Sequence, residues 1–452
     1  MLTELSLDNF KSWKIIDRMR LAPITGLFGT NSSGKTSVLQ LLLMLKQTIE
    51  SSDRAQVLEF GDEKSMTNLG SFRDIVYEHK KPGTIDFSLN WNLSKSLVIK
   101  DPESKTHTLL TVDKLGFSAT VSEDDANRLA VSNLEYDVNG NRFVLKRKGS
   151  NGAKYELTNE NEGIRFTRTQ GRAWDLPAPV KFYGFPDQVY AYYQNAGFLA
   201  DLQLAFENLF GRLYYLGPLR EFPARHYGWK GSEPGDMGRR GERVVDALLA
   251  SRQKGSYISP GYKRKKQTLE QRVAYWLKEL GLIHDFTVER IAEGNNLYEV
   301  RVKKTVLSAD VLITDVGFGV SQILPVLVLC YYVPEGSVIL LEQPEIHLHP
   351  SVQSGLADVF IDVMKNRNVQ IILESHSEHL LRRLQRRIAE EVITPSETAL
   401  YFCEVVDAGS KLTALDVDLF GNIKNWPKDF FGDDFGEMAA MTKAAMVRKQ
   451  AE

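Results

Sequence analysis

Cysteine is scarce in this sequence, and its scarcity excludes some kinds of structure. Only Cys330 and Cys403 occur among 452 residues, with no CxxC spacing and no histidine beside either. A disulfide-rich scaffold and a cysteine-based zinc site are therefore excluded. Two isolated cysteines are typical of a reducing compartment, so we expect a cytoplasmic protein.

Long apolar runs and a large net charge are also missing. The longest apolar run, ILPVLVLCYYV, is shorter than the about 20 residues that a membrane-spanning helix needs. The N-terminus, MLTELSLDNF, carries acids and lacks the basic and then apolar form of a signal peptide. We therefore expect no membrane association. The formal net charge of −2 gives no general attraction to polyphosphate, so DNA binding would need a local basic patch.

The composition that remains is that of a globular protein with several lobes. The 452 residues are 43% hydrophobic and 25% charged. A chain of this length and composition can form two or more apolar cores.

A glycine loop lies between an expected strand and an expected helix near the N-terminus. Apolar residues from about Ile24 to Phe28 lead into GTNSSGKTSVLQLLLMLKQTI, in which Gly29 and Gly34–Thr36 match GxxxxGK[ST]. In this order of elements, the loop amides and the helix N-terminus hold phosphate oxygens. We expect Lys35 to neutralise the β- and γ-phosphates of a nucleotide and Thr36 to bind magnesium.

The loop resembles that of one group of ATPases. GTNSSGKTS, after LDNFKSW, is similar to the GxNxSGK[ST] loop and the NF(K/R)S turn of ATPases related to structural-maintenance-of-chromosomes, RecF and OLD (overcoming lysogenization defect) proteins, which belong to the ABC superfamily. The resemblance implies ATP and Mg²⁺ as ligands, and it implies a later signature loop, acidic strand and switch histidine. The loop residues that it places at the nucleotide are Gly29, Asn31, Ser33, Gly34, Lys35, Thr36 and Ser37.

Two apolar segments in the second half of the chain match the acidic strand and the switch histidine. VILLEQPE supplies four apolar residues and then Glu342, at the position that holds magnesium in the family. Thr36 and Glu342 are therefore the expected metal ligands. VQIILESHSEHLLRRL ends as a strand at Glu374, and His376 then matches the histidine that contacts the γ-phosphate in the family.

The segment DVGFGVSQILPVLVL occupies the place of the signature loop, immediately before an apolar helix. In the family this loop contacts the nucleotide held by the opposite subunit, so two chains sandwich two nucleotides and we expect an ATP-dependent homodimer. Gly317, Gly319 and Ser321 are its candidate nucleotide contacts. Gly317 stands at the usual serine position and Phe318 replaces the first glycine, so a side-chain contact would fall to Ser321. An ordinary glycine turn before a buried helix is the alternative.

Histidines gather near the acidic strand, which raises the question of zinc. Four of the eight histidines lie at positions 347, 349, 376 and 379. No adjoining cysteine or second acidic cluster completes a recognisable zinc spacing. We expect His347 and His349 to be structural or interface residues, with a zinc site as the alternative.

The expected fold class is α/β, an ABC-type P-loop nucleotide-binding domain with an antiparallel β-subdomain and a helical insertion. Alternating residues between about Thr84 and Thr169, with an Asn139-Gly140 turn, predict the antiparallel lobe, and apolar residues at helical spacing between about Phe198 and Leu282 predict the insertion. No heptad pattern persists, so no long coiled coil is expected. The expected boundaries are 1–80 and 301–400 for the two halves of the ATPase domain, 81–180 for the β lobe, 181–300 for the helical lobe and 401–452 for a small C-terminal domain.

Two basic features lie in the expected helical lobe. Arg220 and Arg225 follow an expected strand end, from which they could reach a phosphate or an opposing acid; a solvated or structural ion pair is the alternative that we favour for each. The run KRKK lies in a loop flanked by proline and glycine, beside Tyr262. Four cations in a loop are usually solvated, but this run is the best candidate for a DNA contact. Its residues are Lys263, Arg264, Lys265 and Lys266.

The C-terminal segment extends the resemblance. KLTALDVDLFGNIKNWPKDFF resembles a small C-terminal domain of unknown function that ends many stand-alone ATPases of this type, and such ATPases also carry EQPE in the acidic strand. Relatives of this kind often act beside a separate effector, commonly a nuclease, in bacterial anti-phage systems. The resemblance therefore implies a sensor or scaffold that controls such an effector. The alternative is a RecF-like DNA-repair ATPase that acts on DNA ends or gaps.

Gln343 stands where a catalytic base is expected. An amide cannot accept the proton of the attacking water, but a glutamine can orient the water, as in small GTPases. Glu345 and Glu374 are the other candidate bases; capping of the next helix or pairing at the dimer surface is the alternative role for Glu345. We therefore expect slow hydrolysis and a long-lived ATP-bound dimer. The expected catalytic residues are Glu342, Gln343, Glu345 and His376.

Overall fold

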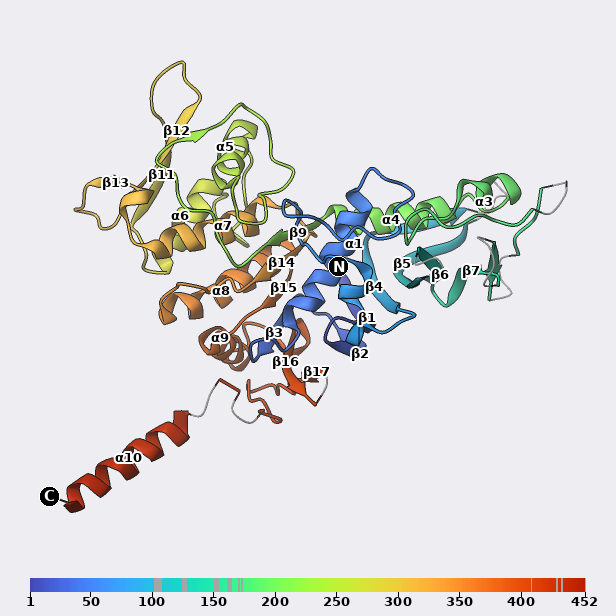
Figure 1. Ribbon diagram of the computed structural model, residues 1–452. Helices are drawn as coiled ribbons and strands as arrows, with labels where there is room; N and C mark the ends of the chain where they lie inside the picture. The colour runs from blue at the N-terminus through green and yellow to red at the C-terminus, as the bar shows by residue number, and fades with distance from the viewer. Residues whose placement is uncertain are drawn as a thin grey trace.

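The computed structural model describes residues 1–100, 108–123, 128–149, 154–160, 165–169, 171, 174–407, 409–427, 430–431 and 434–451. It contains a six-stranded central sheet, a seven-stranded antiparallel sheet and a four-stranded small sheet, with helices around them (Figure 1). The predicted α/β class with an antiparallel β lobe is confirmed. The longest helices in the described part of the chain have 18 residues, which is too short for a long coiled coil.

The central sheet has five parallel strands and one antiparallel edge strand. Strand β16 pairs in parallel with β3, β3 with β15, β15 with β14 and β14 with β9, whereas β17 runs antiparallel to β16. Nearly continuous apolar sequences such as QIILE are typical of strands buried on both faces. In spatial order the strands are β17 (Gly409–Ala414), β16 (Thr398–Val406), β3 (Ile24–Gly29), β15 (Gln370–Glu374), β14 (Val338–Glu342) and β9 (Leu213–Leu216).

Each face of the central sheet belongs to a different apolar core. Leu27 and Leu340 point into a core shared with the antiparallel sheet and with α1 (Lys35–Glu50). Phe28 and Leu341 point into a core formed with the helices of the other face. Side chains alternate along a strand, so each strand stabilises both cores. The helices of the second face include α7 (Phe318–Tyr332), α8 (Pro350–Arg367) and α9 (Glu378–Ala389).

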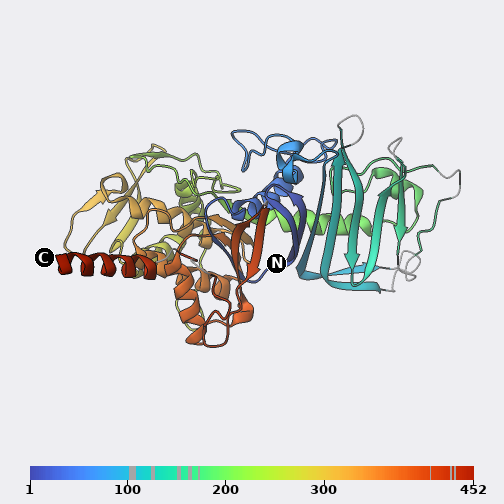
Figure 2. The same cartoon turned by 60° about the horizontal axis from the view of Figure 1, so that its bottom comes forward.

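The antiparallel sheet begins before the phosphate loop, because β1 and β2 pair with each other and β1 pairs with β4. The predicted Asn139-Gly140 turn joins β6 to β7, with φ angles of 52° and 86° that suit a tight hairpin. Figure 2 shows the strands of this sheet side by side. In spatial order they are β2 (Trp13–Arg20), β1 (Leu2–Phe10), β4 (Thr84–Lys100), β5 (Thr108–Glu123), β6 (Leu129–Val138), β7 (Asn141–Arg147) and β8 (Tyr155–Asn159).

The part of the chain between β9 and α7 combines helices with the small sheet. The small sheet consists of β10 (Tyr227–Gly228), β12 (Leu297–Lys303), β11 (Asp285–Arg290) and β13 (Asp310–Leu312). Helices α5 (Val244–Lys254) and α6 (Leu269–Glu279) lie in this part. Together with α4 (Leu199–Gly211), which precedes β9, they form the predicted helical segments. Short helices elsewhere are α2 (Phe72–Ile75), α3 (Asp187–Tyr192), η1 (Tyr77–His79), η2 (Ile313–Asp315) and η3 (Pro395–Glu397).

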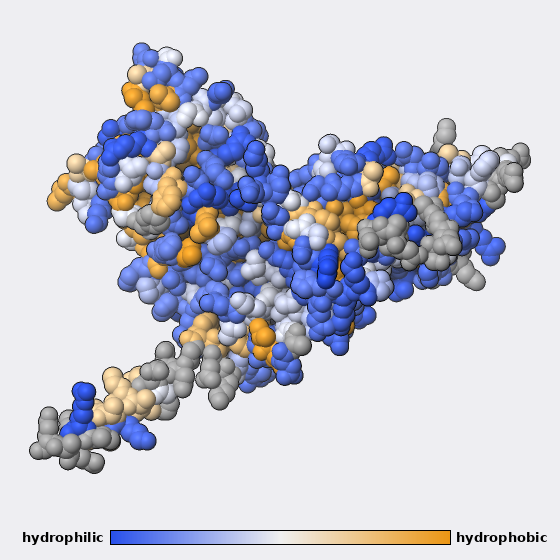
Figure 3. Space-filling model, in the orientation of Figure 1, coloured by the Kyte–Doolittle hydropathy of each residue, from blue (hydrophilic) through white to orange (hydrophobic). Residues whose placement is uncertain are grey.

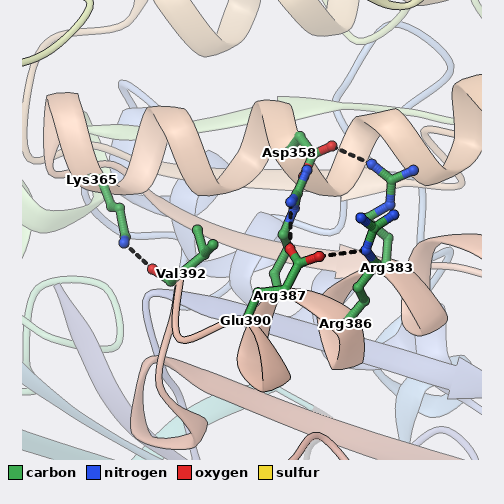
Figure 4. A network of polar contacts seen from close by, with 7 residues as sticks. All are labelled: Asp358, Lys365, Arg383, Arg386, Arg387, Glu390 and Val392. Carbon is green, nitrogen blue, oxygen red and sulfur yellow. Dashed lines mark hydrogen bonds and ion pairs between the residues drawn. The ribbon is translucent and has the colours of Figure 1, made fainter.

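Helices α8 and α9 are held together by a polar network (Figure 4). The carboxylate of Asp358 on α8 accepts hydrogen bonds from Arg383, at 2.5 Å, and Arg387, at 2.6 Å, both on α9. Glu390 pairs with Arg387 and Arg386, and Lys365 donates to the carbonyl oxygen of Val392. This network joins α8, which follows β14, to α9, which follows β15.

The C-terminal residues pack on the strand that leads into the phosphate loop. The Phe430 ring lies edge to face with Phe28, at 6.3 Å between centroids, and with Phe402, at 4.7 Å. Trp426 lies 5.0 Å from Phe430, and the Arg382 guanidinium stacks over its ring at 4.4 Å. This segment therefore covers the central sheet.

The structure divides the chain differently from the predicted boundaries. The boundary at residue 80 separates β1 and β2 from the antiparallel sheet to which they belong, and the boundary at residue 401 falls inside β16 of the central sheet. The expected helical lobe, 181–300, also contains β9 of the central sheet, β10 and β11 of the small sheet and the beginning of β12. Sheets combine strands that are far apart in sequence, so changes of composition along the chain do not mark their limits.

Helix α10 (Asp434–Ala451) stands away from the rest of the chain (Figure 1). Its Met438, Met441 and Met446 side chains are exposed, and Figure 3 shows pale orange, weakly hydrophobic atoms on part of the helix and blue, hydrophilic atoms beside them. Among the described residues, no helix combines the length and the apolar character that crossing a membrane requires.

Candidate active site

Four neighbouring parallel strands end at one edge of the central sheet. They are β3, β15, β14 and β9, which end at Gly29, Glu374, Glu342 and Leu216. Open α/β sheets bind their ligands beyond the carboxyl ends of parallel strands. The expected residues of the phosphate loop, the acidic strand and the switch histidine all follow these ends, and the structure brings them together.

The phosphate loop has a backbone that requires glycine at two positions. Gly29 has a φ of 136°, and a Cβ there would lie 2.0 Å from the carbonyl oxygen of Cys403. Gly34 has a φ of 85°. The Lys35 ammonium, only 3% exposed, donates to the carbonyl oxygens of Thr30 at 2.6 Å and Gly29 at 3.1 Å. Burial lowers the pKa of Lys35, and the nearby Glu374 carboxylate opposes this effect. These hydrogen-bond partners are uncharged, so an anionic oxygen would be a stronger ligand for the ammonium.

The other loop residues expected at the nucleotide differ in exposure. Asn31 is exposed, whereas Ser33 and Ser37 are buried. The Ser33 hydroxyl donates to the Thr30 carbonyl oxygen at 2.8 Å, and the Ser37 amide donates to the Gly34 carbonyl oxygen at 3.0 Å. The Ser33 side chain therefore stabilises the turn, Ser37 contributes its backbone N–H, and Asn31 is exposed like its neighbours Thr30 and Ser32.

Thr36 is tied to the next strand through Glu374. The Thr36 hydroxyl donates to Glu374 Oε2 at 2.7 Å. The backbone N–H of Gln343 donates to the backbone carbonyl oxygen of Glu374 at 2.9 Å. The Gln343 side chain also hydrogen-bonds to the Glu374 carboxylate. Gln343 has a φ of 42°, in the left-handed region that is uncommon for residues other than glycine. Gln343 is thus held by Glu374 at the turn after β14.

Glu342 is a buried carboxylate whose partner comes from β9. Its Oε1 accepts a hydrogen bond from the Tyr215 hydroxyl at 3.0 Å. Burial, together with repulsion from Glu374, raises the pKa of Glu342 to about 7. Two buried carboxylates near one another repel, and a bound cation would relieve that repulsion.

Glu345 is buried beside the switch histidine, with 6% of its surface exposed. Its Oε1 accepts a hydrogen bond from the His376 backbone N–H at 2.7 Å, while its Oε2 has no hydrogen-bond partner among the described residues. Burial raises the pKa of Glu345. Helix α8 is capped instead by His349, whose Nδ1 accepts from the Ser351 amide at 3.3 Å. The capping role considered for Glu345 is therefore wrong.

His376 lies half-buried at the end of β15. Burial, and then the charge of Lys35, lowers the pKa of the His376 imidazole below its usual 6.5. The imidazole is therefore neutral at pH 7 and offers one donor and one acceptor nitrogen.

These residues fit magnesium and a nucleoside triphosphate. Glycines with positive φ angles shape the loop so that its backbone N–H groups can bind phosphates, and the buried Lys35 ammonium adds a positive charge. The Thr36 hydroxyl and the Glu342 carboxylate are oxygen ligands of the kind that Mg²⁺ prefers. The orphaned Oε2 of Glu345 is a further polar atom that a ligand or water would satisfy.

The signature segment lies on the other face of the central sheet. Helix α7 packs in the core of that face, whereas α1, which follows the phosphate loop, packs in the first core (Figure 1). Gly317 is exposed at the N-terminus of α7, Gly319 is half-buried, and Ser321 is 7% exposed. The segment therefore does not join the phosphate loop within one chain, and burial makes Ser321 a poor substitute for the missing serine.

The two arginines after β9 have different surroundings. Arg225 forms an exposed ion pair with Asp315 at 2.9 Å, which is the structural role that we favoured. Arg220 is buried at the site, and none of its three side-chain nitrogens has a hydrogen-bond partner among the described residues.

The KRKK run is an exposed loop away from the strand ends. All four residues are exposed, in the loop closed by the bridge between Ile258 and Gln267. Tyr262 is 88% exposed, and the Lys263 ammonium lies 5.1 Å from the centre of its ring. The loop thus combines cations with one exposed aromatic ring.

The histidines near the acidic strand do not gather around a common centre. His347 and His379 are exposed, and His349 caps α8. Within the described ranges, no three histidine, cysteine, aspartate or glutamate side chains form a group that could hold a metal ion.

Sequence reasoning missed Tyr215 as the partner of Glu342, and it favoured an ion pair for Arg220. Both residues belong to the segment LYYLGPLR, a short apolar strand followed by a turn. Glu342 ends β14 and His376 follows β15 closely, so polar residues at or just after the end of each buried strand were the signal that could have found Tyr215 and Arg220.

Two family models match parts of the chain. Residues 251–381 match the family described as AAA ATPase domain, and residues 393–441 match the family described as protein of unknown function (DUF3696). The first match contains the signature segment, the acidic strand and His376, and it supports ATP binding and hydrolysis as the general activity. The two matches cover less than half of the chain. Among curated proteins, none is similar enough in sequence to match it.

Solved structures of SMC head domains are similar to this chain at low sequence identity. The SMC head domain from Thermotoga maritima is 10% identical to this chain, and the match covers 92% of this chain and 99% of that domain, with a TM-score of 0.42. An SMC head bound to the C-terminal winged-helix domain of ScpA is 11% identical, with 92% and 98% covered and a TM-score of 0.46. An SMC head with an extended coiled coil, bound to the C-terminal domain of ScpA from Pyrococcus furiosus, is 9% identical, with 99% of each chain covered and a TM-score of 0.45.

Proposed function

We propose that the chain binds magnesium-ATP at the carboxyl edge of the central sheet and hydrolyses it slowly. The observation that carries this proposal is the 2.7 Å hydrogen bond from Thr36 to Glu374, which joins the phosphate loop to the strand that ends beside His376. The electrostatic proximity of Lys35 to Glu374 and His376, and of Glu374 to Glu342, also supports a single site.

Each side chain has a role that follows from its chemistry. The loop amides and Lys35 bind the phosphates, and Thr36 with Glu342 would hold Mg²⁺. Magnesium, when bound, neutralises the charge that develops on the phosphoryl oxygens. Glu345 accepts the proton of the attacking water at Oε2, and the His376 backbone N–H fixes the carboxylate through Oε1.

Slow turnover is expected because the position next to Glu342 holds no base, so that the role falls to the buried Glu345. The position after Glu342 carries an amide, which cannot act as a base, and its side chain is engaged by Glu374. Steady-state phosphate release is the test: slow release that DNA does not stimulate is expected. Absence of both nucleotide binding and release would contradict the proposal.

We further propose that ATP joins two copies of the chain in a symmetric dimer. The position of Gly317 on the face opposite α1 supports this, because an exposed helix N-terminus is suited to phosphate held by a second copy. Each site would then combine the phosphate loop of one copy with α7 of the other.

Light scattering measures this dimerisation directly. The mass should rise from 51.1 kDa for one chain to twice that value when magnesium-ATP is added. The Lys35→Ala variant, which lacks the phosphate-binding ammonium, should keep the mass of one chain under both conditions. A wild-type mass of one chain with and without ATP would show that the dimer does not form.

The role proposed for the dimer is that of a sensor or scaffold which controls a separate effector, for instance a nuclease, in bacterial anti-phage defence. Support comes from the resemblance of the EQPE strand and the C-terminal segment to stand-alone ATPases of that kind. Co-expression with the products of neighbouring genes should give a complex whose stability depends on ATP. A chain that purifies alone with and without ATP would argue against this role.

A RecF-like DNA-repair ATPase is the second candidate, and the exposed KRKK loop beside Tyr262 favours it. If this loop binds DNA, replacing all four cations by alanine should weaken DNA binding and reduce the salt slope, by about 0.9 for each phosphate that the loop neutralises. Nucleotide binding should stay unchanged. Replacing the exposed Lys80 and Lys81 provides the control for charge removal elsewhere. Unchanged DNA affinity and slope would rule out the loop.

A further inference from the structure

Arg220 is a buried cation without hydrogen-bond partners among the described residues. Its side chain is 4% exposed, and Nε, Nη1 and Nη2 all lack a partner. Other arginines differ: the buried Arg272 pairs with Asp362 at 2.5 Å, and the half-buried Arg367 donates to the Val333 carbonyl oxygen at 2.6 Å. Leaving a buried charge without partners is unfavourable, so such an arrangement calls for a ligand.

The place of Arg220 in the fold indicates which ligand fits. Arg220 follows the end of β9, as Glu345 follows β14 and His376 follows β15, so it belongs to the edge that holds the site. Burial lowers the pKa of Arg220 to about 10, and nearby Tyr215, Glu345 and Glu342 oppose this effect. The guanidinium therefore remains charged at pH 7.

An ion pair with Glu345 is the simplest alternative for Arg220. Glu345 Oε2 is the nearby carboxylate oxygen without a partner, yet no hydrogen bond or ion pair joins it to Arg220 in the described structure. The Arg220 guanidinium and Glu345 Oε2 therefore both remain available to hydrogen-bond to a ligand.

We infer that Arg220 donates hydrogen bonds to the γ-phosphoryl oxygens of ATP bound in the same chain. This inference rests on the proposed function. A planar guanidinium with several donors matches a phosphoryl group. Arg220 lies near Glu342 and Glu345, the carboxylates proposed to hold Mg²⁺ and the attacking water, so the γ-phosphoryl group is the part of the nucleotide that would lie beside it. The cation would also stabilise the charge of the transition state beside the water held by Glu345.

The test uses the full chain with Arg220→Met, Arg220→Lys and a matched control, Arg301→Met, whose arginine is paired with Glu299 in a partly exposed position on β12. Thermal unfolding is measured without nucleotide, and binding is measured for magnesium-ADP and for a non-hydrolysable magnesium-ATP analogue. The Met variant should unfold no more easily than the wild type without nucleotide, because it loses a buried charge without partners.

The decisive result is a difference between the two nucleotides. Arg220→Met should bind the ATP analogue at least about 10-fold more weakly, bind ADP with little change, and turn over about 1,000-fold more slowly, as for other arginines that contact the γ-phosphate. Arg220→Lys should recover part of both losses, because it retains the charge, and Arg301→Met should resemble the wild type.

Three outcomes would overturn the inference. Equal losses of ADP and ATP binding, or easier unfolding without nucleotide, would assign Arg220 a structural role. Wild-type affinity and turnover in both Arg220 variants would show that it does not contact the phosphate. Failure of the wild-type chain to bind either nucleotide would instead overturn the proposed function as well, so the two failures are distinguishable.

Discussion

Replacing Lys35 by alanine is expected to lower the affinity for magnesium-ATP at least about 100-fold and to abolish measurable hydrolysis. A hydrogen bond to a charged group contributes about 1.5–3 kcal/mol, and Lys35 is positioned to make two with the β- and γ-phosphates. The ammonium lies in the loop, 2.6 Å from the Thr30 carbonyl oxygen, and exchanging such neutral acceptors for anionic phosphate oxygens is favourable. Titration calorimetry with magnesium-ATP measures the loss.

The control for Lys35→Ala is Lys14→Ala, which removes an exposed positive charge from β2. Lys14→Ala should bind ATP as the wild type does. If Lys35→Ala retained wild-type affinity, the loop would not be the phosphate site, even though its backbone has the required conformation.

Replacing Glu345 by glutamine should reduce turnover about 100- to 10,000-fold with little change in ATP affinity. Glutamine has nearly the same shape, and its side-chain oxygen can still accept the His376 N–H that Glu345 Oε1 accepts at 2.7 Å. Its nitrogen cannot accept a proton from water. Single-turnover phosphate release, with nucleotide affinity measured in parallel, separates the chemical step from binding. Glu335→Gln, an exposed change before β14, is the matched control.

The companion variant Gln343→Glu should not accelerate turnover. The Gln343 side chain hydrogen-bonds to the Glu374 carboxylate, and a glutamate there would bring two like charges together. Faster hydrolysis by Gln343→Glu, combined with normal hydrolysis by Glu345→Gln, would show that Glu345 is not the base and that the amide at position 343 limits turnover.

The local elements of the site were predictable because their patterns are local. The strand from Ile24, the glycine loop and the helix at Lys35 follow each other directly, and the acidic strand ends at Glu342 as its apolar run predicts. The expected strand before His376 is β15, which ends at Glu374. Periodicity and turn residues specify such segments without reference to the rest of the chain.

The contacts between these elements were not predictable, because they join residues far apart in sequence. Tyr215 reaches Glu342 only because β9 pairs with β14, and periodicity does not specify which strands pair. The place of β16 was not predictable for the same reason: its apolar sequence is that of a buried strand, but only its pairing with β3 places it in the central sheet. The orphaned charges of Arg220 and Glu345 become visible only when burial is known.

The neighbours of β3 determine when an ATP site can exist during synthesis. Strand β3, which carries the phosphate loop, emerges early from the ribosome, but both strands that flank it, β15 and β16, are translated more than 300 residues later. The strands β1, β2, β4 and β5 can pair long before then. Contacts between distant segments form late. A nascent chain should therefore acquire its antiparallel sheet first, and it should remain unable to capture ATP until β16 has been translated.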